Sequence, residues 1–230
     1  MHPSCQTLGV PIPPLQQLEA LDPLFAQHGP VGQALFDKCN AEVFPCDALV
    51  FAVLDRSLGL IKGVSVLMQH GGYASAVALV RMQLDSVLRL YGVLASGDAH
   101  TLAERVMHGV PLRDLKDKGG KKLTDRHLVN EFKKLAPWVE PLYDHCSGYI
   151  HLSSRHISYF LGRSHNTDEG TRTFAIGDED EHVPEEGKER MIQAFTATTT
   201  ALLKLANAWI EVRDTHGTNE QLKSIYAKDA

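Results

Sequence analysis

The chain has 230 residues, of which 43% are hydrophobic and 22% are charged, and its formal net charge is −5. These are ordinary globular proportions, so they exclude a disordered or fibrous chain. The length suits one large domain, and we interpret 1–230 as a single domain with its core over about 31–213. The acidic total provides no overall positive field for a nucleic-acid backbone, although it leaves open RNA binding through a local patch.

The four cysteines form no CxxC pair, and three of them lie within or beside apolar helical patterns, where a thiol behaves as a small hydrophobic group. We therefore expect reduced thiols and a cytoplasmic protein. The first residues lack the basic and apolar regions of a signal peptide, and no uncharged apolar run approaches the roughly 18 residues that cross a membrane. We expect neither secretion nor a membrane partner.

The N-terminal part of the chain reads as helices after a Pro-rich segment. Apolar spacing predicts helices over Leu15–Gln27 and Val31–Phe44, separated by the helix-breaking run at 28–30. A longer helix is expected from Asp47, where apolar residues recur on one helical face, to the glycine pair at 71–72.

The next helix, Tyr73–Ala95, is apolar on nearly all sides, which indicates a helix buried at the centre of a bundle. Two shorter helices, Asp98–Met107 and Thr124–Leu135, each begin with a good capping residue. The segment Pro111–Lys122 between them is a charged, glycine-containing loop.

The C-terminal part contains two further helices and one interruption. A helix is expected over Pro137–Gly162 with a bend at Pro141, and a final helix over Pro184–Arg213 with a frayed tail after it. Between them, only Thr171–Ile176 alternates enough to form a strand, and no second strand is evident. The sequence therefore predicts an all-α, single-domain helical bundle with an irregular or β-like insertion near 163–187.

A charged stripe crosses the central helix. Arg81, Asp85 and Arg89 are four residues apart, so they lie along one side of it. The stripe either faces solvent and forms two weak ion pairs, or lies inside the bundle and requires buried partners.

The candidate partners follow Pro141 and recur with helical spacing: Tyr143, Ser147, His151 and Ser154. An apolar strip lies beside them: Leu142, Cys146, Ile150 and Ile157. Such polar groups could bind a small polar ligand, or they could satisfy one another in a buried network. For His151 alone, a hydrogen-bonded structural role is favoured.

Motifs for other chemistry are absent from the sequence. The twelve histidines include no HExxH spacing, and no GxGxxG, GxxxxGK[ST] or GxSxG motif occurs, so we expect no metal site and no cofactor. Basic residues cluster over 113–134. This pattern favours a solvated surface, and the cluster is the one local patch in the sequence that could contact RNA.

Two stretches together resemble the bacterial HEPN-like helical proteins of uncharacterised function. They are Ala76–Asp85 and the pattern Tyr143-x-x-x-Ser147-x-Tyr149-Ile150-His151-Leu152-Ser153. The resemblance implies an all-α bundle, commonly dimeric, whose relatives include ribonuclease toxins and abortive-infection components. It also implies a family-defining group of six residues, here called the polar seam: Arg81, Asp85, Tyr143, Ser147, His151 and Ser153.

The ribonucleases of that family carry an Arg followed after four to six residues by a His. The nearest pairs here, Arg105 with His108 and Arg213 with His216, are too closely spaced. The sequence therefore assigns no catalytic residue and favours a protein that is not an enzyme.

Three functions follow as hypotheses. The first is a binding module in stress or phage defence that uses the polar seam for a small polar ligand or a partner. The second is a metal-independent ribonuclease in which His151 is the general base and Arg81 stabilises the transition state. The third is a structural module that forms a homodimer.

Overall fold

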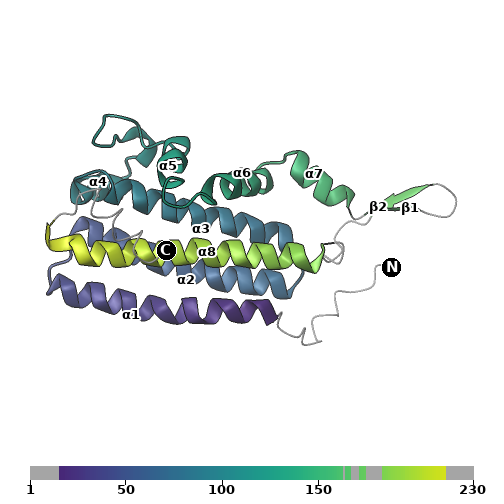
Figure 1. The fold of residues 1–230 in the computed structure, drawn as a ribbon, viewed down its shortest axis with the longest axis horizontal. Coiled ribbons are helices and arrows are strands. Elements are labelled where there is room, and N and C mark those ends of the chain that lie inside the picture. The colour runs from purple at the N-terminus through teal and green to yellow at the C-terminus, as the bar shows by residue number, and fades with distance from the viewer. Residues whose placement is uncertain (1–15, 163, 167–170, 175–182, 216–230) are drawn as a thin grey trace.

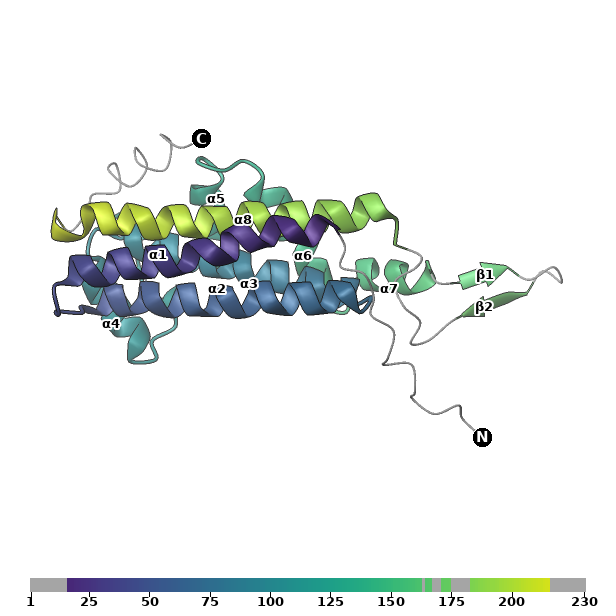
Figure 2. The ribbon, with the colours of Figure 1, turned by 90° about the horizontal axis from the view of Figure 1, so that it is seen from below.

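The computed structural model describes residues 16–162, 164–166, 171–174 and 183–215. Four long helices lie side by side in a bundle: α1 (Asp22–Cys39), α2 (Pro45–Gln69), α3 (Tyr73–Leu94) and α8 (Glu185–Val212) (Figures 1 and 2). The α2 helix runs opposite to the other three. The predicted all-α helical bundle is confirmed. No helix in the described part of the chain is both long enough and apolar enough to cross a membrane.

Helix α3 is the centre of the structure. It packs against α2 and α8 within the bundle and against α6 (Val139–Ile150) on its outer side (Figure 1). Most of its side chains are buried, including Val77, Leu84 and Leu88. The prediction from its nearly continuous apolar pattern is therefore confirmed, because only a helix covered on several sides can bury that many residues.

The remaining elements are short: η1 (Gln16–Leu21), α4 (Ala99–Met107), η2 (Leu112–Asp114), α5 (Asp125–Phe132), α7 (Ser154–Leu161), β1 (Ser164–Asn166), β2 (Arg172–Phe174) and η4 (Arg213–Thr215). The predicted caps are confirmed. Asp98 accepts a hydrogen bond from the Thr101 N–H at 3.1 Å, and Thr124 accepts one from the His127 N–H at 3.4 Å. Each satisfies one of the first amides of its helix.

The prediction of two N-terminal helices is wrong, because α1 continues through His28, Gly29 and Pro30. Proline removes one backbone hydrogen bond, which here would reach the Ala26 carbonyl. Both Pro30 and Ala26 are exposed, so water can satisfy that carbonyl. On the opposite face His28 is buried, and its packing keeps the helix continuous.

The prediction of one helix to Gly162 is also wrong. Helix α6 ends at Ile150, and His151 has extended backbone. Helix α7 begins after Ser153, whose hydroxyl accepts a hydrogen bond from the Arg155 N–H at 3.2 Å. Serine competes for the backbone in this way and starts a new helix where spacing alone predicts a continuous one.

The insertion forms a hairpin that extends beyond the end of the bundle (Figures 1 and 2). Strand β2 lies within the predicted strand, and it pairs antiparallel with β1, with His165 opposite Thr173. The expectation of an unpaired strand is therefore wrong, because three polar residues in β1 give no alternating apolar pattern. The Pro-rich segment, the end of the predicted strand and the tail after residue 215 lie outside the described residues.

A buried ion pair joins the N-terminus of α2 to the C-terminus of α8. Asp47 accepts hydrogen bonds from Arg213 at 2.9 to 3.1 Å and from the Trp209 indole at 2.8 Å. It also accepts one from the Phe44 N–H at 2.9 Å. Burial alone would raise the pKa of Asp47, but these hydrogen bonds outweigh it and lower the pKa.

The same arginine also holds the end of α1. Arg213 donates to the Lys38 carbonyl at 3.3 Å and to the Glu42 carbonyl at 2.7 Å. We call Asp47 and Arg213 together the clamp, because they connect three helices at one end of the bundle.

A polar layer crosses the middle of the bundle, with one side chain from each long helix: His28, Ser57, Gln83 and Thr199. Gln83 donates to Ser57 at 2.6 Å and to Thr199 at 3.0 Å. His28 Nδ1 donates to the Leu24 carbonyl at 2.7 Å, and Nε2, 2.9 Å from Ser57 Oγ, can accept the hydroxyl hydrogen only when the imidazole is neutral. The layer therefore requires a neutral His28, and burial lowers the pKa of this imidazole despite the opposing hydrogen bond to Leu24.

The thiols also follow the prediction where they are described. Cys39, Cys46 and Cys146 are buried and unbridged.

The clamp predicts a large loss of stability in Asp47→Ala, because Arg213 would be left buried without its charge partner. We expect the free energy of unfolding, measured with urea, to fall by about 3 to 5 kcal/mol. The control is Asp55→Ala on the exposed side of α2, which should change it by less than about 0.5 kcal/mol. Equal effects of the two variants would contradict the role of the clamp.

The polar layer predicts that the protein loses stability as the pH falls. Below about pH 6.5 the unfolded chain binds a proton at His28 that the folded chain resists, so the unfolding free energy should fall, by at most about 1.4 kcal/mol per pH unit. Urea unfolding at several pH values checks this. The slope should shrink in His28→Gln and persist in His70→Gln, whose imidazole is exposed; an unchanged slope in His28→Gln would refute the assignment.

Candidate functional site

Arg81, the first member of the polar seam, is buried among paired groups. Its guanidinium forms an ion pair with Asp85 one turn along α3. Its Nε donates to Ser147 Oγ at 3.3 Å, and its guanidinium carbon lies 3.9 Å from the centre of the Tyr143 ring. Four residues predicted from spacing on two helices are therefore brought together.

Asp125 of α5 completes this network and was not predicted. It lies 3.7 Å from Arg81 and 3.6 Å from Arg89, and it accepts a hydrogen bond from the Tyr143 hydroxyl at 3.4 Å. Burial alone would lower the pKa of Arg81, but Asp85 outweighs it and raises the pKa. The guanidinium is thus permanently charged and already neutralised, which is typical of a buried structural network.

The other two predicted residues lie apart from this network. His151 follows the end of α6 and is exposed, so the expectation that it faces Arg81 is wrong. Ser153 caps α7 and donates to the Gly148 carbonyl at 2.6 Å. The break between α6 and α7 removes both from the face that Tyr143 and Ser147 share.

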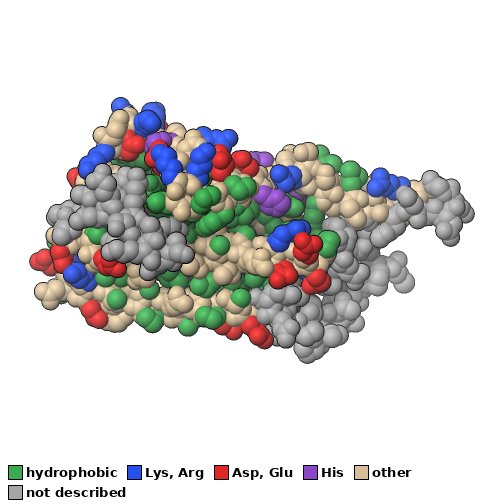
Figure 3. Space-filling view, in the orientation of Figure 1, with side chains coloured by type: hydrophobic (Ala, Val, Ile, Leu, Met, Phe, Trp, Pro, Cys, Tyr) green, Lys and Arg blue, Asp and Glu red, His purple; other side chains and the backbone are tan. Residues whose placement is uncertain are grey.

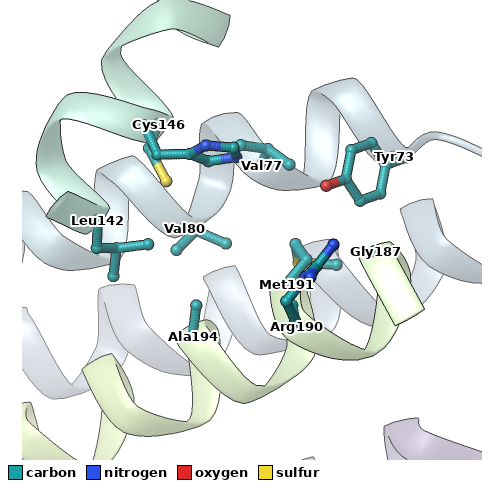
Figure 4. A pocket seen from close by; sticks show the side chains of 10 residues that line it. Tyr73, Val77, Val80, Leu142, Cys146, Gly187, Arg190, Met191 and Ala194 are labelled. Carbon is teal, nitrogen blue, oxygen red and sulfur yellow. The ribbon is translucent and has the colours of Figure 1, made fainter. Parts of the chain in front are cut away.

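A pocket of about 380 Å³ lies beside the seam, where α3, α6 and α8 meet (Figure 4). We call it the α3–α8 pocket; its lining residues are Tyr73, Val77, Val80, Leu142, His145, Cys146, Gly187, Arg190, Met191 and Ala194. In Figure 4, Tyr73 and Leu142 stand at opposite ends of the pocket, and Arg190 extends from α8 on the side of Tyr73.

The pocket exists because α8 carries small residues where a bundle helix ordinarily carries large ones. Gly187 and Ala194 are two turns apart and line the pocket on either side of Met191, and their small size leaves space unfilled between the helices. Figure 3 shows apolar surface along the boundary between α6 and α8, with charged groups over the start of α8.

Three tyrosines, here called the tyrosine cluster, extend the site beyond Tyr73. The Tyr73 and Tyr159 rings are stacked with centroids 6.2 Å apart, and Tyr149 meets each of them edge-on at 6.3 Å. A second hollow of about 500 Å³ lies beside this cluster and shares Tyr73, Gly187 and Arg190 with the pocket. The two hollows therefore adjoin at these three residues, one with an apolar lining and the other with an aromatic lining.

Hydrogen-bond donors surround the site. Arg155 donates from one terminal nitrogen to His145 Nδ1 at 3.1 Å, and Gly148 leaves room for its side chain, because a methyl group at 148 would collide with it. Burial, and then the charges of Arg155 and Arg190, lower the pKa of His145. Because Nδ1 accepts from Arg155, the neutral imidazole carries its proton on Nε2 and can donate it to a ligand.

The remaining polar groups fit binding better than catalysis. Burial raises the pKa of the Cys146 thiol to about 12, so it supplies no thiolate nucleophile. In the described part of the chain, Arg190 forms an ion pair with Glu186 alone, at 2.8 Å, and both side chains are largely exposed. Such a pair is weak, and an anionic ligand can replace Glu186. Within the described ranges, no three potential metal ligands converge.

Comparison with protein-family models, with curated proteins and with solved structures finds no match for this chain. The resemblance to HEPN-like helical proteins therefore stays a prediction of the sequence.

The residues of this site gave little signal in the sequence. Leu142 and Cys146 belong to the predicted apolar strip and do line the pocket, whereas Ile150 and Ile157 of that strip are exposed. The detectable signal was the spacing of Gly187, Arg190 and Ala194 on one face of α8, which places small residues and a cation on a side that should be large and apolar.

The seam network predicts that Arg81→Met destabilises the fold, because Asp85 and Asp125 lose their shared partner. We expect a loss of about 2 to 3 kcal/mol in urea unfolding, less than for a fully buried pair since both carboxylates are partly exposed. Arg89→Met on the same helix is the matched control, and its half-exposed side chain should cost under about 1 kcal/mol. A smaller loss for Arg81→Met than for the control would be inconsistent with a buried network.

Proposed function

We propose that this protein is a non-catalytic binding module whose α3–α8 pocket takes a small ligand with a planar aromatic part and an anionic group. The observation that carries the proposal is the pocket itself, an apolar chamber bordered by Arg190 and continuous with the tyrosine cluster. Ligand sites in helical proteins are commonly of this kind, apolar with a few convergent polar groups.

Different residues of the site would contact different parts of the proposed ligand. Val77, Val80 and Ala194 provide apolar contact for a ring, and Tyr159 and Tyr149 provide faces and edges for stacking. The anionic group fits Arg190 and Arg155, two guanidinium groups that line the second hollow.

The binding hypothesis differs here from the version based on the seam, because the guanidinium of Arg81 is already neutralised. The ribonuclease hypothesis needs Arg81 and His151 at one phosphate, and the first is buried under Tyr143 while the second is exposed beyond α6. This geometry favours binding. A role in stress or phage defence, and a homodimer, stay predictions of the sequence.

The dye 8-anilino-1-naphthalenesulfonate, which has planar rings and one sulfonate, tests the proposal. We expect saturable binding to the folded protein, measured by fluorescence. Ala194→Phe should weaken it about tenfold or more by filling the pocket, and Arg190→Gln should weaken it several-fold, by about 1 kcal/mol of binding free energy.

Two matched controls make the same kinds of substitution outside the pocket. Gln193→Phe places the ring on the exposed face of α8, and Arg126→Gln removes an exposed arginine on α5. Both should bind the dye like the unchanged protein, and melting temperatures should establish that every variant is folded. If Ala194→Phe and Gln193→Phe bind equally well, the pocket is not the site.

A further inference from the structure

A second pocket, of about 520 Å³, lies between α2, α3 and α4, and we call it the α2–α4 pocket. It shares no lining residue with the α3–α8 pocket. Its apolar walls are formed by aliphatic side chains, which include Val53, Leu90, Val93, Val106, Val110 and Leu112. None of its lining residues in the described ranges is aromatic, so the pocket suits a flexible aliphatic group rather than a stacked ring.

Two arginines also line the α2–α4 pocket, Arg56 from α2 and Arg89 from α3. The Arg56 Nε donates to Ser86 Oγ at 3.2 Å, and Ser86, which is buried, in turn donates to the Met82 carbonyl at 3.1 Å. Ser86 thus fixes one edge of the Arg56 guanidinium. The terminal nitrogens of Arg56 make no hydrogen bond or ion pair to the described part of the chain, so they are available to an anion.

The charges around this pocket do not cancel. Asp85 also lines it, but this carboxylate is paired with Arg81. Asp125 forms an ion pair with each of two arginines, at 3.7 Å from Arg81 and at 3.6 Å from Arg89. Three arginines against two aspartates leave one positive charge beside an aliphatic wall. This matches one carboxylate better than a phosphate group, which carries nearly two negative charges at pH 7.

We propose that the α2–α4 pocket binds an aliphatic monocarboxylate, with its carboxylate held by Arg56 and Arg89 and its hydrocarbon chain along Val93 and Val106. A guanidinium with a fixed edge and a free fork suits a carboxylate, because it can donate two parallel hydrogen bonds without reordering. The hydrocarbon gains from leaving water for the aliphatic walls. This site lies at the exposed end of the charged stripe on α3, to which Asp85 and Arg89 belong.

Calorimetric titration of the full chain with octanoate tests the proposal, with protonated octylamine as the probe of opposite charge. We expect octanoate to bind and octylamine to bind at least about tenfold more weakly. Arg56→Gln and Arg89→Gln should each weaken octanoate binding several-fold, and Arg56→Lys should restore part of it. Arg126→Gln, which removes an exposed arginine elsewhere, should leave it unchanged.

The location is checked in the same protein by labelling valine methyl groups for NMR. Octanoate should shift the methyl resonances of Val53, Val93 and Val106 and leave those of Val77 and Val80 unchanged. Octanoate should also still bind to the Ala194→Phe variant. Octanoate that does not bind, octylamine that binds equally well, or binding that Ala194→Phe abolishes would each overturn the proposal. The last result would assign octanoate to the α3–α8 pocket and leave the proposed function standing.

Discussion

The hydrogen-bonded layer of His28, Ser57, Gln83 and Thr199 is the constraint on which the bundle depends. Apolar side chains can slide past one another at small cost, but a buried amide or imidazole that loses its partner costs about 1 to 3 kcal/mol. Because each long helix contributes one member, rotating or shifting any of them would leave polar groups unpaired in an aliphatic core. The layer therefore fixes the register of all four helices, and with it every residue that α3 presents on its other sides.

With that register fixed, the two ends of the bundle differ in the contacts that the helices make. At one end the clamp of Asp47 and Arg213 connects three helices through charge-assisted hydrogen bonds. At the other end α8 begins with Gly187 and Ala194 facing α3, and the α3–α8 pocket results.

Charged residues on α3 also take two roles. Arg81 lies under Tyr143 with its charge matched by Asp85 and Asp125, so it holds α3, α5 and α6 together. Arg89, two turns along, shares Asp125 as its one ion-pair partner among the described residues, and it lines an open pocket. The same spacing therefore gives a structural group at one end of the stripe and an accessible cation at the other.

The sequence was sufficient for features that depend on one helix or on neighbouring residues. The buried pattern of Tyr73–Leu94 and the caps at Asp98 and Thr124 were predicted for that reason. The contact between Arg81 and Ser147 was also predicted, because both lie on strongly periodic helices.

Features that depend on several elements could not be predicted. The continuity of α1 through Pro30 results from the burial of His28 against other helices, and the place of His151 results from the cap that Ser153 provides for α7. A pocket is space that side chains leave unfilled, and its size depends on the distances between three helices. The periodicity of the sequence contains no information about those distances.

The most direct test of the central claim, that the α3–α8 pocket is a binding site for an aromatic anion, is the set of intermolecular nuclear Overhauser effects between bound 8-anilino-1-naphthalenesulfonate and the valine methyl groups of α3. The account predicts contacts from the naphthalene protons to Val77 and Val80, which line the pocket, and none to Val87, which is buried farther along the helix. Contacts confined to methyl groups outside the pocket, in a protein that still binds the dye, would contradict it.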